Sequence, residues 1–180
     1  MHRPSLGPDG RYATRPLGPP DLGALQALFE RVADYFVIAT GSAPAPDEAE
    51  RAYVAGPPTK AVHDKRVLGV FGPDGALVGV LDALTGWPDP STWSIGLLVV
   101  DPAHRGRGLG TATLDAFEAW AATQGARRLR TAVVAHHGPG VRFLERHGYV
   151  AESPPERDGA DRGRPTVVFL SKPAPGQVLP

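Results

Sequence analysis

Residues 91–124, STWSIGLLVVDPAHRGRGLGTATLDAFEAWAATQ, decide the fold of this chain. Gly96 to Val100 form an apolar run without polar alternation, which predicts a strand that is buried on both faces. Pro102 follows, and because proline lacks a backbone N–H it should end the strand. A helix is then predicted from about Gly108, with an apolar face formed by Leu114, Phe117 and Ala121.

The turn between this strand and this helix carries glycines at alternate positions, Gly106, Gly108 and Gly110. Glycine has no Cβ, so backbone N–H groups here can approach a ligand closely. The start of a helix adds unpaired N–H donors and the positive end of the helix dipole. Arg105 and Arg107 would add positive charge beside phosphate oxygens. The turn therefore predicts a phosphate or pyrophosphate site rather than a plain surface turn with two arginines.

Two other phosphate-binding turns fit the sequence poorly. A dinucleotide-binding turn has the spacing Gly-x-Gly-x-x-Gly directly after a strand, with an acidic residue at the end of the next strand. Here the glycines alternate, and the next predicted strand ends in Ala135-His136-His137. A P-loop needs a lysine followed by serine or threonine, which this turn lacks. Both differences argue against a dinucleotide oxidoreductase and against a P-loop nucleotidase.

The turn resembles the acyl-CoA-binding motif of the GNAT superfamily of N-acetyltransferases, in which Arg/Gln-x-x-Gly-x-Gly/Ala joins a strand to a helix. Residues 105–110 fit this motif at every fixed position, and Phe143 to Tyr149 resembles the family's Phe-Tyr-x-x-x-Gly-Phe. The similarity extends, more weakly, over about residues 12–170. It implies an α/β (α+β mixed sheet) fold: a GNAT-like mixed central sheet of about six to seven strands with helices on both faces. Two parallel central strands would splay apart to admit the cofactor arm.

The resemblance also implies acetyl-CoA as co-substrate, without a metal. Backbone groups of Leu98 and Val100 would pair with the pantetheine arm as an added strand does. A backbone N–H at the end of the strand would stabilise the tetrahedral oxyanion, and N–H groups of the turn would hold the pyrophosphate. The implied cofactor-binding residues are Leu98, Val99, Val100, Arg105, Gly106, Arg107, Gly108, Leu109, Gly110, Thr111 and His137.

The residues that handle protons in many members of the family are missing here. Leu144 stands where a tyrosine often serves as acid for the departing thiol, and Ser94 and Ala132 stand where a catalytic glutamate often lies. His137 takes the place of an asparagine that contacts the cofactor arm. The titratable groups expected near the cleft are Asp82, His136 and His137, although each could instead be an ordinary structural residue.

The acceptor site is the least determined part of the sequence. The resemblance places the first two helices along one wall of it, which makes aromatic residues candidate substrate contacts, although core packing explains them as well. These candidates are Tyr35, Phe36 and Trp93. The acceptor would be a primary amine of a small molecule or a peptide, and a catalytically silent acyl-CoA-binding or sensing domain is the alternative function.

The pKa of the acceptor decides how much catalytic help it needs. A lysine-like amine with a pKa of ~10.4 is neutral in about one molecule in ~2,500 at pH 7, a penalty of ~4.6 kcal/mol, whereas an α-amino group loses only ~1 kcal/mol. Histidine is the natural base near neutral pH. The missing glutamate therefore leaves two hypotheses: an acceptor of low pKa, or a histidine base.

Composition limits the remaining classes. With 180 residues, 19 basic and 19 acidic side chains and no cysteine, the chain predicts one globular domain without disulfides or a zinc-thiolate site. Zero net charge argues against a nucleic-acid or membrane-surface partner. No signal-peptide-like or membrane-spanning stretch occurs, so we expect a cytoplasmic protein. A homodimer is allowed by this composition.

The remaining elements follow from periodicity and turn residues. We expect a loose leader over residues 1–10, a polar loop over 153–165 and a disordered tail over 173–180, with a single domain over 1–180 whose core spans about 12–170. The predicted strands are 12–17, 67–71, 76–84, 93–100, 128–134, 149–151 and 166–170, and the predicted helices are 19–32, 34–38, 47–54, 108–124 and 138–147.

Overall fold

The computed structural model describes residues 5–6, 10–61, 64–152 and 166–177 of the chain. Within them, eight strands form one mixed sheet with helices on both faces, which confirms the predicted fold class. The strands are β1 (Ser5–Leu6), β2 (Tyr12–Pro16), β3 (Lys65–Phe71), β4 (Leu77–Leu84), β5 (Thr92–Val100), β6 (Arg128–Val134), β7 (Val150–Ala151) and β8 (Val167–Pro173). The α-helices are α1 (Leu22–Arg31), α2 (Ala33–Thr40), α3 (Glu48–Val54), α4 (Leu109–Thr123) and α5 (Gly138–Arg146).

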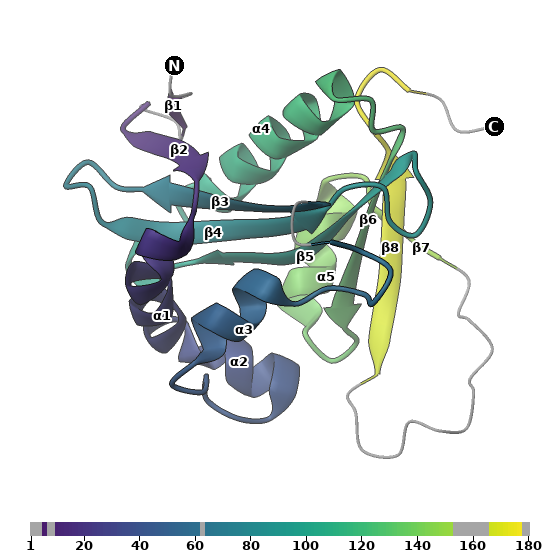
Figure 1. The fold of residues 1–180 in the computed structure, drawn as a ribbon. Helices are drawn as coiled ribbons and strands as arrows, with labels where there is room; N and C mark the ends of the chain where they lie inside the picture. The colour runs from purple at the N-terminus through teal and green to yellow at the C-terminus, as the bar shows by residue number, and fades with distance from the viewer. Residues whose placement is uncertain (1–4, 7–9, 62–63, 153–165, 178–180) are drawn as a thin grey trace.

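The strand order is β1-β2-β3-β4-β5-β6-β8-β7 (Figure 1). Neighbouring strands run antiparallel except β5 and β6, which run parallel and are connected through α4, as predicted. The β3–β4 turn also follows its sequence signal: Gly75 has a positive φ of 80°, and its N–H donates to the Gly72 carbonyl over 2.9 Å. Local sequence therefore explains both the central crossover and this hairpin.

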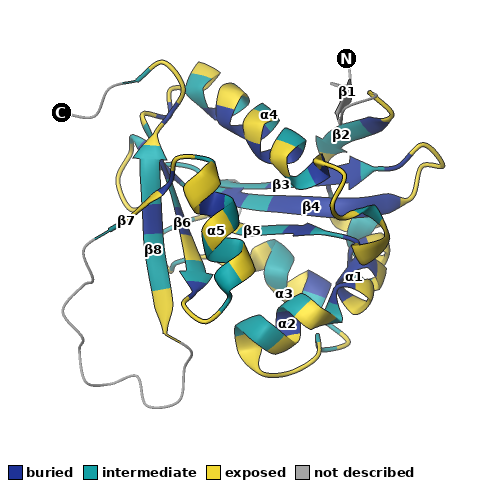
Figure 2. Cartoon of the chain, turned by 180° about the vertical axis from the view of Figure 1, so that it is seen from behind, coloured by how far each residue is buried: buried dark blue, intermediate teal, exposed yellow. Residues whose placement is uncertain are grey.

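The two layers of helices bury separate cores (Figures 1 and 2). On one face, α4 and α5 pack with the sheet through a cluster that includes Phe117, Leu144 and Leu129. On the other face, α1, α2 and α3 cover a second cluster that includes Phe29 and Val80. Among the described residues, no helix is long and apolar enough to cross a membrane.

The parallel strands β5 and β6 separate after a short paired stretch. Their pairing runs only from Thr92 opposite Arg128 to Ile95 opposite Thr131. The Thr131 hydroxyl donates to the Ile95 carbonyl over 3.0 Å at the last pair. On the opposite edge of β5, the pairing with β4 shifts register around Gly96, which is the extra residue of a bulge. The sheet is thus opened between β5 and β6 from Gly96 onward.

This opening corrects the prediction that Gly96 to Val100 is buried on both faces. Gly96 is exposed, and Leu97 and Leu98 are only partly buried. The run is apolar because it lines a cavity, whose wall needs apolar side chains just as a core does. A pattern of apolar residues does not distinguish the two environments.

The chain ends also differ from their predictions. Ser5–Leu6 pairs with β2 instead of belonging to a loose leader. Residues 173–177 do not form the expected disordered tail, because Pro173 ends β8 and Ala174 is buried, with its N–H donating to the Arg127 carbonyl over 2.9 Å. The expected 153–165 loop and residues 178–180 lie outside the described residues.

Candidate active site

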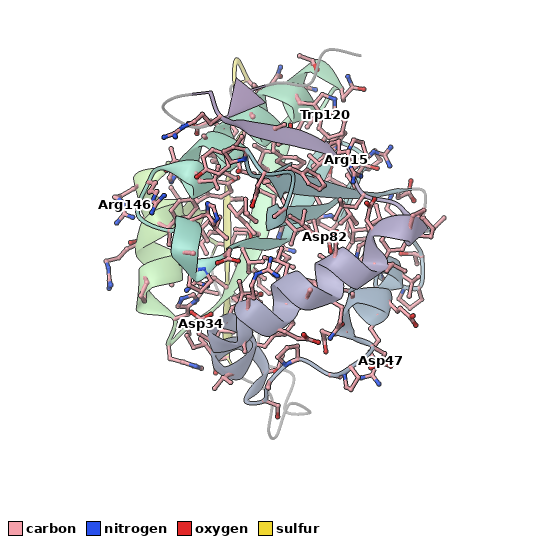
Figure 3. The ribbon with its side chains drawn as sticks, turned by 90° about the vertical axis from the view of Figure 1, so that its left-hand side faces the viewer. Arg15, Asp34, Asp47, Asp82, Trp120 and Arg146 are labelled. Atoms are coloured by element: carbon pink, nitrogen blue, oxygen red, sulfur yellow. The ribbon has the colours of Figure 1, made fainter. Side chains whose placement is uncertain are left out.

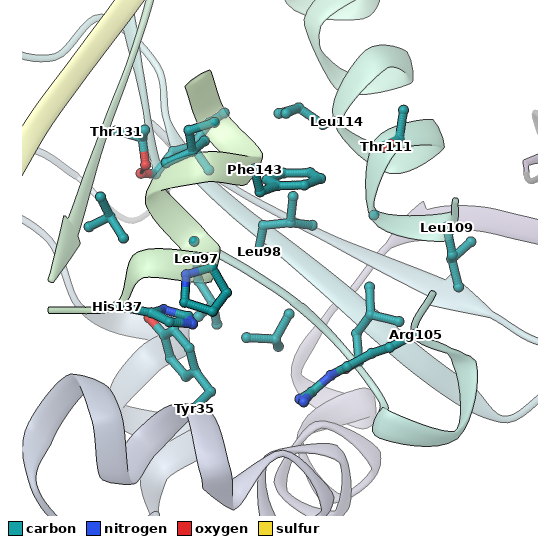
Figure 4. A pocket seen from close by; sticks show the side chains of 18 of the residues that line it. Tyr35, Leu97, Leu98, Arg105, Leu109, Thr111, Leu114, Thr131, His137 and Phe143 are labelled. Carbon is teal, nitrogen blue, oxygen red and sulfur yellow. Dashed lines mark hydrogen bonds between the residues drawn. The ribbon is translucent and has the colours of Figure 1, made fainter. Parts of the chain in front are cut away.

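A cavity of about 490 Å³ fills the gap where β5 and β6 separate (Figure 4). One part of its wall comes from the α4–α5 side of the sheet, where Leu114 and Leu144 belong to the core cluster and Leu98 packs against it. Another part comes from the α1–α3 side, where Val99 belongs to the second cluster and Leu97 packs against it. The cavity therefore passes from one face of the sheet to the other.

The exposed edge of β5 offers main-chain groups to this cavity. The Asp101 N–H donates to the Val78 carbonyl over 2.9 Å, so residues 99 and 101 face β4. Because main-chain groups alternate along a strand, Leu98 and Val100 face the opposite way, toward β6. Beyond Ile95, no residue of β6 pairs with β5 in the described structure. Leu98 and Val100 lie in the cavity wall on this edge, where the Val100 carbonyl accepts a hydrogen bond from Arg105 Nε over 2.7 Å.

The glycine-rich turn has the backbone that its sequence predicts. Gly106 and Gly108 have φ values of 72° and 74°, in the left-handed region that favours glycine. Gly108 is the N-cap of α4 and supplies no side-chain cap, so N–H groups of the first turn, including those of Gly110 and Thr111, lack intrahelical partners. A Cβ on Gly106 or Gly108 would meet no described protein atom within 4 Å. The turn is therefore an open cradle of N–H donors.

One acidic and one basic side chain hold this turn against the rest of the fold. Asp101 accepts a hydrogen bond from the Ala103 N–H over 2.9 Å, at the start of the 3-10 helix Pro102–His104. Arg31 on α1 pairs with Asp101 and donates to the Leu77 carbonyl over 2.7 Å. The cradle is thus anchored to α1 and β4 as well as to its own strand.

Arg105 points toward α2 across the mouth of the cavity. Its Nε donates to the Val100 carbonyl over 2.7 Å, and its two terminal nitrogens contact the carboxylate of Asp34, one of them over 3.0 Å. This hydrogen bonding lowers the pKa of Asp34. Arg107, also predicted to bind the cofactor, is exposed and does not line the cavity, whereas Arg146 on α5 does.

The three predicted aromatic contacts separate into one wall residue and two core residues. Tyr35 lines the cavity, and burial, followed by the charge of Asp82, raises its pKa. Phe36 is 6% exposed and packs edge-on against Phe29, and Trp93 is 7% exposed and packs against Trp120. The placement of Phe36 and Trp93 follows from helical and strand alternation, which turns neighbouring side chains to different sides.

The two histidines also separate. His137 lines the cavity, while His136 is exposed and does not. A Cβ on Gly140 would lie 2.9 Å from His137 Nδ1, so the absence of a side chain there makes room for the ring. Burial, followed by the neighbouring charges of His136 and Arg105, lowers the pKa of His137 below its ordinary 6.5, although Asp34 opposes the shift. His137 is therefore predominantly neutral at pH 7.

Asp82 lies one layer behind the cavity rather than in its wall. A Cβ on Gly96 would be 3.7 Å from the Asp82 carboxylate, which pairs with Lys65 over 2.9 Å. Burial raises the pKa of Asp82, while Lys65 opposes the shift. One carboxylate oxygen, Oδ1, is buried without a hydrogen-bond partner among the described residues. The space in front of Gly96 is therefore one route from Asp82 to a ligand in the cavity.

The remaining predicted cofactor residues, Val99, Leu109, Gly110 and Thr111, lie in the cavity wall. Several wall residues were not selected from the sequence. Phe143 could have been selected from the sequence, because it begins the second motif, residues 143–149. In the structure its ring would lie 3.7 Å from a Cβ on Gly110. Unselected wall residues also include four from the segment 91–124, Ile95, Gly96, Leu97 and Leu114, and seven that carry no local signal, Asp34, Ile38, Thr131, Val133, Pro139, Gly140 and Arg146. In the described residues, no group of three or more His, Cys, Asp or Glu side chains is arranged to hold a metal ion.

Comparisons with known proteins agree with this geometry. A family model described as "Acetyltransferase (GNAT) family" matches residues 25–149. No curated protein matches the sequence. A solved structure of an acetyltransferase from Thermus thermophilus is similar, with 26% sequence identity, a TM-score of 0.71, and coverage of 90% of this chain and 96% of that chain.

Two further solved structures show likeness of fold. Spermidine N-acetyltransferase from Vibrio cholerae, in complex with CoA and spermine, has 18% identity and a TM-score of 0.68, covering 91% of this chain and 96% of that chain. The ribosomal-protein-S18-alanine N-acetyltransferase from Escherichia coli has 15% identity and a TM-score of 0.68, covering 94% of this chain and 96% of that chain. The acceptors in the names of these two proteins differ, so the likeness of fold does not identify an acceptor for this chain.

Proposed function

This chain belongs to the GNAT acetyltransferase family, and from that premise we propose that it transfers an acetyl group from acetyl-CoA to a primary amine of a small molecule or peptide. One observation carries the proposal: the unpaired edge of β5 leads directly into the open N–H cradle at the start of α4. A free strand edge can pair with an extended arm that contains amides, and an anion site can bind a pyrophosphate. A ligand in which such an arm is attached to a pyrophosphate therefore suits this arrangement.

The pyrophosphate, the pantetheine arm and the thioester of the cofactor each have a group to bind them in this arrangement. N–H groups at the start of α4 hold the pyrophosphate, and the main-chain groups of Leu98 and Val100 pair with the pantetheine amides. The thioester then lies near Gly96, where the bulge and the missing side chain leave room. The Leu98 N–H, on the open edge, is positioned to donate to the developing oxyanion.

The reaction is direct attack in a ternary complex. The amine nitrogen forms a bond to the thioester carbonyl carbon, and collapse of the intermediate breaks the carbon–sulfur bond. Leu144 cannot protonate the departing sulfur, but a thiol of pKa ~8.5 leaves as thiolate at pH 7 at a cost of only ~2 kcal/mol. The harder step is removal of the amine proton, for which His137 is the neutral group in the cavity wall.

We expect the His137→Gln variant to lose about 10²-fold in kcat/KM, the usual scale of general-base help. Because the pKa of His137 lies below 6.5, its titration should steepen the wild-type profile only below pH 6.5. There both the imidazole and the amine must lose protons, so the slope of log kcat/KM against pH should be about two, and about one in the variant. Steady-state rates across about pH 5–9 provide the measurement, a range that spans the imidazole titration.

His136→Gln is the matched control, since this neighbouring histidine does not line the cavity. It should stay within a few-fold of the parent. If His137→Gln acetylates a lysine-like amine at the rate of the parent protein, His137 is not the general base. Asp82, acting through a water in front of Gly96, would then be tested by Asp82→Asn.

A catalytically silent acyl-CoA-binding domain is the second candidate function. Leu144 favours the silent domain, because this buried residue, 9% exposed, stands where many members of the family have a tyrosine that acts as an acid. Thiol release from acetyl-CoA with a panel of amines, including polyamines, lysine-like amines and peptide N-termini, separates the two. Amine-dependent thiol release supports the transferase, whereas tight CoA binding without turnover on any member of the panel supports the silent domain.

A further inference from the structure

We propose that Asp34 and Arg105 form an exchangeable ion pair that couples cofactor binding to acceptor binding. In the free protein they bind each other. When the cofactor binds, its pyrophosphate binds Arg105, and the released Asp34 carboxylate then binds the ammonium group of the acceptor. The inference rests on the proposed acetyl transfer and assigns Asp34 as a residue that selects cationic acceptors. Both side chains line the cavity; Arg105 is labelled in Figure 4 and Asp34 in Figure 3.

Arg105 lies between its present partner and the N–H cradle. Its Nε donates to the Val100 carbonyl over 2.7 Å, at the end of β5, while the two terminal nitrogens contact Asp34. The next residue, Gly106, begins the N–H cradle. Because the guanidinium is a rigid planar group, its fork reaches an anion in the cradle by rotation about the side-chain torsions of Arg105. That rotation releases Asp34 and the Val100 carbonyl together, and the fork can then bind two phosphate oxygens.

Asp34 is placed to receive a cation when Arg105 leaves. It lies in the first turn of α2, its side chain is 52% exposed, and Arg105 is its ion-pair partner in the described residues. Tyr35 follows it in the cavity wall and offers an aromatic face, which also attracts an ammonium group. An uncompensated carboxylate beside an aromatic ring is a site for a protonated amine rather than for an anion.

The exchange is favourable because an exposed ion pair stabilises little. Arg105 is 40% exposed in this pair, and pairs of that kind contribute little net free energy. A doubly charged pyrophosphate, held at the same time by backbone N–H groups, is the stronger partner. Before the cofactor arrives, Asp34 is neutralised and an acceptor ammonium finds no free counter-charge. Linkage then requires each substrate to raise the affinity of the other by the same factor.

The test is the Asp34→Asn variant, measured by calorimetry with CoA and by steady-state kinetics with an amine acceptor. Because Arg105 is freed, CoA should bind several-fold more tightly than to the parent. Because the acceptor loses its counter-charge, its KM should rise about tenfold or more with a smaller change in kcat. Adding Arg105→Ala to Asp34→Asn should abolish the gain in CoA affinity.

Asp47→Asn is the matched control. Asp47 is 48% exposed and pairs with Arg51 over 2.8 Å, but it lies away from the cavity (Figure 3). It should change neither CoA affinity nor KM. Unchanged or weaker CoA binding in Asp34→Asn would overturn the exchange, and an unchanged KM would overturn the acceptor contact. A parent protein that does not bind CoA would instead overturn the proposed function itself, so the two failures are distinguishable.

Discussion

Replacing Gly108 with valine is expected to weaken CoA binding at least about 100-fold while the protein remains folded. The N–H groups at the start of α4 would each make a hydrogen bond to a charged phosphate, worth about 1.5–3 kcal/mol. A valine side chain at this N-cap projects into open space beside the first turn of α4, because no atom of the described residues, apart from its neighbours along the chain, lies within 4 Å of the position that its Cβ would take. Displacing the pyrophosphate from two such bonds costs about 3–6 kcal/mol.

Gly75→Val separates this loss from backbone strain. Gly75 has φ of 80° and no neighbour within 4 Å of its Cβ position, which matches Gly108 with φ of 74°, but it lies in the β3–β4 turn away from the cavity. Left-handed backbone costs a non-glycine residue about 1–2 kcal/mol, and somewhat more when it is β-branched. Both variants should therefore lose similar thermal stability, and calorimetry should show lost CoA binding in Gly108→Val alone. Parental CoA affinity in a folded Gly108→Val protein would refute the anion cradle.

Replacing Glu118 with alanine is expected to lower the free energy of unfolding by about 3–5 kcal/mol, the usual cost of leaving one member of a buried ion pair unpaired. Glu118, on α4, is 3% exposed. It accepts a hydrogen bond from the Tyr149 hydroxyl over 2.9 Å and pairs with Lys172 on β8. Burial, followed by the charge of Glu118, raises the pKa of Tyr149, so its hydroxyl stays protonated and donates.

Urea denaturation measures the change as a shift in midpoint. The control removes the three polar side chains at once, by combining Glu118→Leu, Lys172→Met and Tyr149→Phe. It avoids an unpaired charge and leaves only the His147 carbonyl without the hydrogen bond that Lys172 donates over 2.8 Å, so this variant should lie closer to the parent than Glu118→Ala. A loss below about 1 kcal/mol in Glu118→Ala would show that Lys172 and Tyr149 find water instead.

The backbone of the candidate site could be predicted from sequence where the site is contiguous in the chain. Leu98, Val100 and the glycines of the turn lie within one short segment, and their geometry follows from local rules: a strand, a proline, residues with positive φ and a helix start. The side of the strand that meets the cavity could not be predicted, because an apolar run has the same pattern in a core and in a cavity wall. That distinction arises only where β6 separates from β5 after Ile95.

The sequence by itself determined the fold class, the order of the central elements and the backbone of the glycine-rich turn, since these depend on periodicity, glycine conformation and the start of a helix. Tertiary structure decided which side chains surround the cavity. Asp34 and Arg105 meet although 71 residues separate them, His137 enters the cavity while His136 does not, and Phe36 turns into the core beside Tyr35. The physical reason is that such contacts depend on how one helix packs over the sheet, and small rotations of that helix decide which neighbouring side chain faces the ligand.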